Sequence, residues 1–222
     1  LLLLAQKKRQ LSAKTAGRIA KVLALNKTET EYFLLMARME PENNIEMLLD
    51  GFHASKSDKK FIVIGNTGNA YGSRLVEKYK ADPRIVFLGA IFNQHKLTGI
   101  VKYSAVYFHG HSVGGTNPSL LEAMADGAFI AAHGNAFNKT ILRENALYFQ
   151  DSKEVCSIIE QHDKLFNEDF IRNNYDRIKE DFTWDMIIHQ YDHFFRQCYL
   201  EKTGKQFSIP VAHPGQLVEA ES

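Results

Sequence analysis

Between residues 32 and 149 the chain alternates short apolar runs with longer stretches whose apolar positions recur every three or four residues. The short runs are apolar on both faces, as strands are when helices cover both sides of their sheet. They predict strands over residues 32–37, 61–65, 85–88, 105–109, 128–132 and 146–149.

The longer stretches have the periodicity of amphipathic helices. Residues 45–53 place Ile45, Leu48, Leu49 and Phe52 on one face, and residues 117–125 do the same with Leu120, Leu121 and Met124. The last third predicts helices over 153–166, 168–180 and 184–199. Strand–helix alternation at this spacing predicts an α/β fold with a doubly wound parallel sheet and a helical C-terminal segment.

The N-terminal residues have a different pattern. Ser12 is a candidate N-cap for a helix whose apolar face holds Ala16, Ile19, Val22 and Leu23, and this helix belongs to no strand–helix unit. We therefore predict a short helical appendage over residues 1–30, a main domain over 31–200 and a flexible tail over 201–222.

Charge separates the appendage from the rest. The net charge of the chain is +1, but residues 1–30 hold seven Lys and Arg against Glu29 alone, so the remainder is mildly acidic. Cys156 and Cys198 lie far apart, and we expect two buried, reduced thiols and no metal cluster. No apolar run approaches the ~18 residues of a membrane span, and Leu1–Ala5 is too short for a signal peptide, so we expect a cytoplasmic protein.

The segment from His109 to Met124, HGHSVGGTNPSLLEAM, carries the strongest chemical signal. A strand ends at His109, a loop with paired glycines follows, and then a helix begins. Ligands of doubly wound folds bind beyond the carboxyl ends of the strands, and a helix N-terminus attracts anions. The backbone of Gly114, Gly115, Thr116 and Asn117 is thus a candidate cradle for a diphosphate, and Glu122 a candidate acceptor for two ribose hydroxyls.

A structural interpretation of the same segment stays open. It would be a tight strand-to-helix turn with Asn117 as N-cap and Pro118 at the first helical position, and His109 would only cap the strand end. That interpretation leaves His111, one of the glycines and Glu122 without a role.

The same segment resembles the signature of retaining family 4 glycosyltransferases of the GT-B fold. Glu122-Ala123-Met124-Ala125-Asp126-Gly127 matches its second half, whereas its first glutamate falls at Gly114. The variant from His109 to Ala123 resembles a rhamnosyltransferase-like branch that acts on bacterial surface polysaccharides. The resemblance, which covers about residues 32–200, implies the Rossmann-like C-terminal domain that binds the nucleotide sugar.

Other motifs follow in the order of that family. Residues 37–44 (ARMEPENN) resemble its diphosphate-binding element, with Arg38 as the phosphate ligand and Asn43 in place of its lysine. Residues 61–66 and 84–89 resemble the strands that lead to the nucleotide, and residues 182–184 with Tyr191 resemble the closing helix. The resemblance implies Arg38, Glu122 and His111 as catalytic residues. It implies a donor site of Arg38, Asn43, Gly65, Asn66, Gly89, Ala90, Ile91, His109, His111, Gly114, Gly115, Thr116, Asn117 and Glu122.

The resemblance also implies a function. The donor would be a nucleoside-diphosphate hexose, with dTDP-rhamnose ahead of UDP- and GDP-sugars, and no metal cofactor is expected because the chain has no Asp-x-Asp motif. The acceptor, a glycan or lipid-linked sugar, would bind a separate N-terminal domain, which would place the protein at the inner face of the membrane. Only about thirty residues precede the first predicted strand, so we expect the chain alone to transfer sugar slowly or not at all.

Two rival hypotheses come from different classes. Residues 11–25 resemble the recognition-helix region of helix-turn-helix regulators, and Lys14, Arg18 and Lys21 would then contact DNA phosphates. The region is too short for a complete three-helix DNA-binding unit. The helix that follows in some such regulators would also overlap the first predicted strand at residues 32–36. A basic amphipathic helix near an anionic membrane is the plainer alternative. The main domain would alternatively be a non-catalytic nucleotide-binding module.

Overall fold

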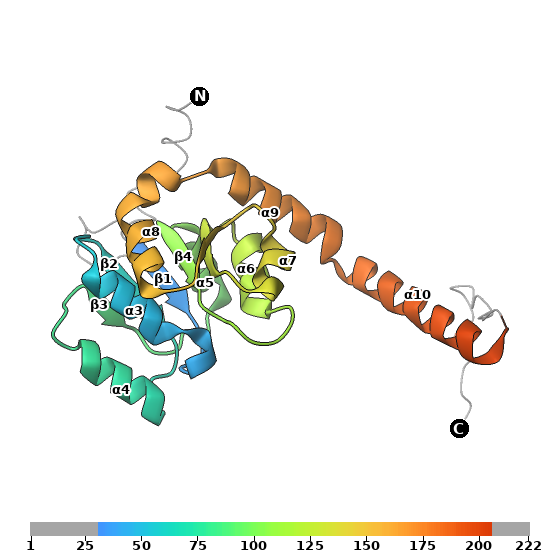
Figure 1. Cartoon of the computed structure of the whole chain (residues 1–222), viewed down its shortest axis with the longest axis horizontal. Helices are drawn as coiled ribbons and strands as arrows, with labels where there is room; N and C mark the ends of the chain where they lie inside the picture. Colours follow the sequence, from blue (N-terminus) through green and yellow to red (C-terminus); the bar gives the residue numbers. More distant parts are fainter. Residues whose placement is uncertain (1–30, 206–222) are drawn as a thin grey trace, which may run out of the picture. The chain divides into compact units, whose positions relative to one another are not determined.

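A computed structural model describes residues 31–205. The predicted appendage and most of the predicted tail lie outside these residues, as does the candidate DNA-binding helix. The chain divides into two compact units, one ending at Ile178 and one beginning at Lys179. The first unit contains every strand of the described chain (Figure 1).

The first unit is built on a parallel sheet with the strand order β3-β2-β1-β4-β5-β6. Its strands are β1 (Tyr32–Met36), β2 (Lys60–Ile64), β3 (Ile85–Phe87), β4 (Val106–His109), β5 (Ile130–His133) and β6 (Leu147–Phe149). The predicted doubly wound sheet is confirmed, and each predicted strand agrees within two residues. Residues 32–36 form a strand, which settles the conflict with the helix-turn-helix hypothesis at this segment.

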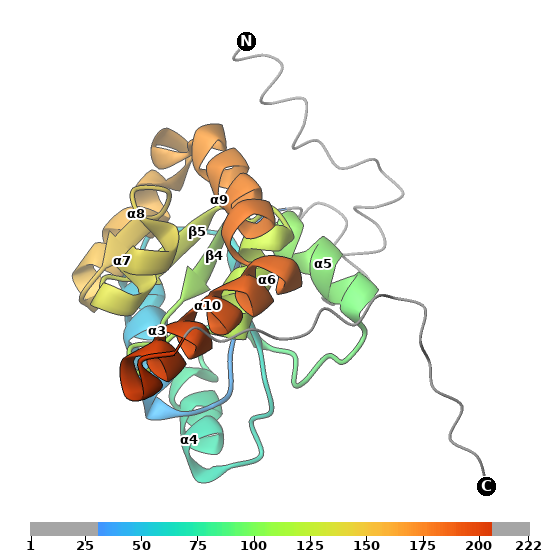
Figure 2. The same ribbon diagram turned by 90° about the vertical axis from the view of Figure 1, so that its right-hand side faces the viewer.

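Helices cover both faces of the sheet. The helices of the first unit are η1 (Pro41–Asn43), α3 (Ile45–Ala54), α4 (Ala70–Tyr79), α5 (Gln94–Lys102), α6 (Pro118–Ala125), α7 (Ala136–Leu142), α8 (Ser152–Leu165) and most of α9 (Glu168–Asp181). Helices α3 and α8 lie on one side of the sheet and α5 and α6 on the other (Figure 2). Gly51 allows α3 and α8 to pack closely, because a Cβ there would lie 2.5 Å from the Ser152 carbonyl oxygen.

The core between α3, α8 and the sheet is rich in aromatic rings. Phe33 of β1 packs against Phe52 of α3 and Phe108 of β4, with both pairs of ring centroids 6.1 Å apart in edge-to-face geometry. Alternate residues of β1 point to opposite faces, and Phe33 and Leu34 are both fully buried. Burial on both faces explains why the strands read as continuous apolar runs.

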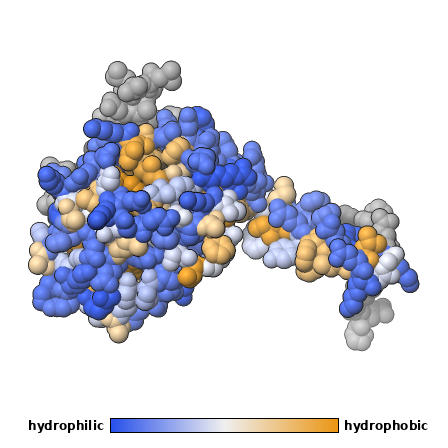
Figure 3. All heavy atoms as spheres, viewed as in Figure 1, coloured by the Kyte–Doolittle hydropathy of each residue, from blue (hydrophilic) through white to orange (hydrophobic). Residues whose placement is uncertain are grey.

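The second unit contains α10 (Trp184–Thr203), which continues past the predicted helix end and into the predicted tail. Thr183 caps it, because its side chain accepts a hydrogen bond from the Met186 backbone N–H. Apolar side chains gather along this helix (Figure 3), and Tyr191 and Phe195 stack with their centroids 5.9 Å apart. Cys198 is exposed on α10 and Cys156 is half-buried on α8, so the expectation of two buried thiols was wrong.

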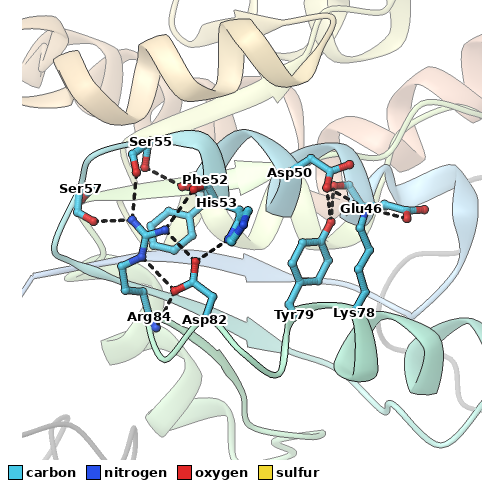
Figure 4. Close-up of polar contacts among 10 residues, drawn as sticks. All are labelled: Glu46, Asp50, Phe52, His53, Ser55, Ser57, Lys78, Tyr79, Asp82 and Arg84. Atoms are coloured by element: carbon cyan, nitrogen blue, oxygen red, sulfur yellow. Dashed lines mark hydrogen bonds and ion pairs between the residues drawn. The ribbon is translucent and has the colours of Figure 1, made fainter.

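A buried ion pair fastens α3 to the loop before β3 (Figure 4). Arg84 donates two hydrogen bonds to the Asp82 carboxylate, at 2.9 and 2.7 Å, and others to the carbonyls of His53, Ser55 and Ser57. The side chain of Asp82 is only 5% exposed and that of Arg84 24%. One guanidinium thus satisfies the C-terminal carbonyls of a helix and a buried carboxylate together.

We expect Arg84→Ala to lower the free energy of unfolding by about 2–3 kcal/mol, since it leaves the buried Asp82 carboxylate with only the His53 ring, 2.7 Å away, as a side-chain partner. Lys78→Ala is the matched control: Lys78 pairs with Glu46 and Asp50 on the exposed side of α3, and we expect a loss below about 1 kcal/mol. Urea denaturation measures both. Equal losses in the two variants would contradict a special role for the buried pair.

The same pair makes stability depend on acidity. The Arg84 guanidinium holds the pKa of Asp82 well below its usual range, against the opposing effect of burial. A depressed pKa contributes stability above the unfolded pKa of about 3.9, and this stability is lost as pH falls. We therefore expect the wild type to lose stability between about pH 5 and pH 2 more steeply than Arg84→Ala, as measured by urea denaturation across that range. Parallel pH curves would refute this assignment.

Candidate functional site

The strand order places a crevice between β1 and β4. The chain moves from β1 outward to β3, returns to β4 beside β1, and then moves outward on the other side. Loops leaving β1 and β4 therefore diverge, and ligands of such folds bind at this switch point. A pocket of about 600 Å³ lies there, lined by residues from the loops after β1, β2, β3 and β4 and from the start of α6.

Close backbone contact between two loops forms the floor of this pocket. Asn44, with φ 49°, ends η1 in a left-handed conformation and donates from Nδ2 to the Gly110 carbonyl at 2.8 Å. The Ser112 backbone N–H donates to the Glu42 carbonyl at 2.9 Å. A Cβ at Gly110 would lie 2.1 Å from the Asn43 carbonyl oxygen, so only glycine allows this approach.

Arg38 gives the pocket its positive charge. It follows β1 and is exposed, and its guanidinium has no hydrogen-bond or ion-pair partner within residues 31–205. A guanidinium that no carboxylate of the described chain neutralises is available to an anionic ligand, and its planar fork suits two phosphate oxygens.

His109 ends β4 inside the pocket wall and is 3% exposed. Burial, aided by the nearby His111, lowers the pKa of His109 to about 3, so its imidazole is neutral near pH 7. Its Nε2 is buried and has no hydrogen-bond partner in the described chain. His109 therefore contributes a polar atom but no charge.

Helix α6 begins as the structural interpretation predicted. Asn117 is its N-cap, with the side chain accepting from the Ser119 backbone N–H at 3.0 Å, and Pro118 occupies its first turn. Gly114 has φ +81°, a conformation that glycine adopts without strain. Asn117, Pro118 and Ser119 line the pocket, so the turn also shapes it.

The loops after β2 and β3 form the opposite wall. The Gly65 N–H donates to the Gly89 carbonyl at 3.0 Å, and a Cβ at Gly65 would lie 2.2 Å from the Ala37 carbonyl oxygen. Ala90, Ile91 and Phe92 follow, and Phe92 is 94% exposed beside the pocket. An exposed aromatic side chain at a pocket rim suits a planar ligand group.

The structure brings most of the sequence-predicted residues together. Those lining the pocket are Arg38, Asn43, Gly65, Asn66, Ala90, Ile91, His109, His111 and Asn117. Those that do not line it are Gly89, Gly114, Gly115, Thr116 and Glu122. Pocket residues that the sequence analysis did not single out as site residues include Glu40, Asn69, Phe92, Pro118 and Ser119.

Asn69 shows which signal was missed. Its Oδ1 accepts from the Gly72 N–H at the start of α4, and its Nδ2 donates to the Met39 carbonyl at 2.7 Å. An asparagine before an amphipathic stretch is an N-cap signal. Taken as an N-cap, Asn69 would have predicted the start of α4. Its hydrogen bond to the Met39 carbonyl joins α4 to the loop that carries Arg38.

Within residues 31–205, no group of three or more His, Cys, Asp or Glu side chains has the arrangement to hold a metal ion. None of the helices in this range is both long enough and apolar enough to cross a membrane.

Comparisons with known proteins agree with this architecture. The family described as "Glycosyl transferases group 1" matches residues 19–181. A search of curated proteins finds no match.

Solved structures of similar fold include HepE of Anabaena in complex with UDP-glucose (TM-score 0.70, 16% identity, 84% of this chain and 54% of that one). Another is a glycosyltransferase of Rickettsia africae (TM-score 0.70, 11% identity, 86% and 53%). A third is the sucrose-phosphate synthase of Thermosynechococcus elongatus (TM-score 0.66, 19% identity, 86% and 51%). The chain spans about half the length of each, and at these identities the likeness shows the fold alone, the Rossmann-like GT-B fold.

Proposed function

The chain belongs to the group 1 glycosyl transferases, and from that premise we propose that its switch-point pocket binds the nucleoside diphosphate of a nucleotide-sugar donor. The observation that carries the proposal is the guanidinium of Arg38, which lines the pocket between β1 and β4 and has no partner within residues 31–205. A diphosphate there would supply the anionic partner that the Arg38 guanidinium lacks within the described chain.

The proposed pose follows the order of the loops. The base would lie toward Ala90, Ile91 and Phe92, and the diphosphate at Arg38. The backbone at Gly114–Asn117 and the carboxylate of Glu122 remain proposed contacts for the diphosphate and the ribose, although of these residues only Asn117 lines the pocket. The complex of HepE with UDP-glucose supports a nucleotide sugar as the class of ligand.

The proposed reaction is hexosyl transfer, in which a nucleoside diphosphate departs. Negative charge develops on the leaving phosphate oxygen, and a guanidinium beside that oxygen stabilises the charge electrostatically. We propose that Arg38 fills this role and that no divalent cation is required. An acceptor must approach the sugar from outside the pocket, so we propose that a second domain holds it and that the described chain alone turns over slowly.

The finer assignments are proposals from the sequence resemblance. We propose a family 4 retaining enzyme of the rhamnosyltransferase-like branch, with dTDP-rhamnose as first candidate donor. Its role would be the synthesis of bacterial surface polysaccharide from a glycan or lipid-linked acceptor. It would act in the cytoplasm at the inner face of the membrane.

Calorimetric titration of the purified chain with dTDP, UDP and GDP, each with and without magnesium, tests the proposal. We expect one nucleotide to bind more tightly than the others and its affinity to be the same with EDTA as with magnesium. Binding that appears only with magnesium would refute the metal-free site. If a folded chain bound none of the three, the proposed function itself would fail.

A further inference from the structure

Three asparagines hold His111 in the pocket wall. Its backbone carbonyl accepts hydrogen bonds from Asn135 Nδ2 at 2.9 Å and Asn138 Nδ2 at 3.0 Å. Its ring Nδ1 lies 2.9 Å from Asn43 Oδ1. Asn43 and Asn138 are themselves buried. The imidazole is therefore fixed through both its main chain and its side chain, as a positioned functional group requires.

The contacts of Asn43 decide which ring nitrogen carries the proton. Asn43 Nδ2 lies 2.8 Å from the Arg38 carbonyl oxygen, which can only accept, so the NH₂ end of the amide must face it. The amide oxygen then faces His111, and Nδ1 of His111 must donate to it. A neutral imidazole has one N–H, so Nε2 of His111 bears a lone pair.

That lone pair is open to a ligand. His111 lines the pocket, and its Nε2 has no hydrogen-bond partner within residues 31–205. A Cβ built on Gly114 in the following loop would lie 4.0 Å from Nε2. Because Gly114 and Gly115 have no side chains, nothing from these two positions covers the nitrogen.

An acceptor atom selects its partner by chemistry. Phosphate oxygens near pH 7 offer no proton, whereas hydroxyl groups do. His111 follows β4, on the far side of β1 from the loops after β2 and β3. With the diphosphate at Arg38 and the base toward Ala90, the part of the donor nearest His111 would be the sugar. Resting on the proposed function, we infer that His111 Nε2 accepts a hydrogen bond from a hydroxyl of the donor sugar, and that Asn43 is the positioning residue that fixes this tautomer.

The tautomer is measured without any ligand. Long-range ¹H–¹⁵N spectra of histidine rings distinguish Nδ1–H from Nε2–H forms, and the signal lost in His111→Gln identifies His111. We expect the Nδ1–H form in the wild type. In Asn43→Asp the carboxylate should favour the doubly protonated ring, which has no acceptor. An Nε2–H form in the wild type would overturn the inference.

Binding measurements test the hydroxyl. We expect His111→Asn, which keeps a polar atom near Asn43 but has none at the place of Nε2, to bind UDP-glucose about 5- to 10-fold more weakly. The affinity for UDP should stay within about twofold, and His111→Gln, whose amide oxygen reaches further, should recover most of the loss. If calorimetry shows that the chain prefers dTDP, then dTDP and dTDP-rhamnose replace UDP and UDP-glucose in this experiment.

The outcomes separate the two proposals. Equal losses for UDP and UDP-glucose would place the hydroxyl on the ribose and overturn the sugar assignment, as would unchanged binding of both. A wild type that binds no nucleoside diphosphate would refute the proposed function. The NMR spectrum would still show whether Asn43 determines the tautomer of the His111 ring.

Discussion

Gly110→Ala is expected to lower the free energy of unfolding by about 3 kcal/mol and to abolish nucleotide binding. The new methyl group would lie 2.1 Å from the Asn43 carbonyl oxygen and 3.0 Å from its carbon, and both are backbone atoms that no rotamer change can move. The loop after β4 would have to leave η1. That movement breaks the hydrogen bonds of Asn44 and Ser112 and separates His111 from Asn43.

Gly99→Ala is the matched control for this variant. Gly99 lies inside α5, where a Cβ would meet nothing within 4 Å, so alanine should stabilise the chain by about 0.5–1 kcal/mol. Urea denaturation and calorimetric titration with the preferred nucleotide measure both variants. A Gly110→Ala protein with wild-type stability and affinity would show that the two loops can separate at no cost and that the pocket floor does not depend on them.

Arg38→Ala is expected to weaken the affinity for the nucleoside diphosphate by about 10- to 100-fold, with stability unchanged. A hydrogen bond to a charged group contributes about 1.5–3 kcal/mol, and each 1.4 kcal/mol is a tenfold change. Stability should not change because Arg38 is exposed and its guanidinium has no partner within residues 31–205. Calorimetry of the variant with the preferred nucleotide gives the ratio.

Two further variants show whether the effect is local. Arg38→Lys keeps the charge but loses the planar fork, so its affinity should fall between those of alanine and the wild type. Arg74→Ala removes a cation of α4 that instead pairs with Glu46 of α3 at the surface, and it should bind like the wild type. If Arg74→Ala weakened binding as much as Arg38→Ala, the effect would come from net charge and not from this site.

The sheet could be predicted from the sequence because burial on both faces leaves a clear mark. Phe61, Ile62 and Val63 are all buried in β2, and no polar residue interrupts such runs. Helices α4, α5 and α7 were not among the helices predicted from the sequence. Their N-caps, Asn69, Asn93 and Asn135, were the better signal.

The site was predictable where a motif follows a strand and not where contacts cross the fold. Arg38 and His109 could be proposed because Arg38 lies in a motif that resembles the family's diphosphate-binding element, and His109 ends an apolar run just before the glycine loop. Asn138 could not, because its contact with the His111 carbonyl joins positions 27 residues apart and depends on how α7 packs. The role of Asn43 was also hidden, since the sequence shows only that it stands where a lysine was expected, whereas the structure shows its hydrogen bonds.

Mapping the bound nucleoside diphosphate by backbone amide chemical shifts tests the central claim most directly. A deuterated, ¹⁵N-labelled chain would be titrated with the nucleotide that calorimetry selects. The switch-point site predicts that the largest shifts fall on Arg38, Gly65, Ala90 and Gly110, which line one pocket but lie on loops after four different strands. Saturable shifts confined to other segments, or none in a folded chain, would contradict a donor site at the β1–β4 switch point.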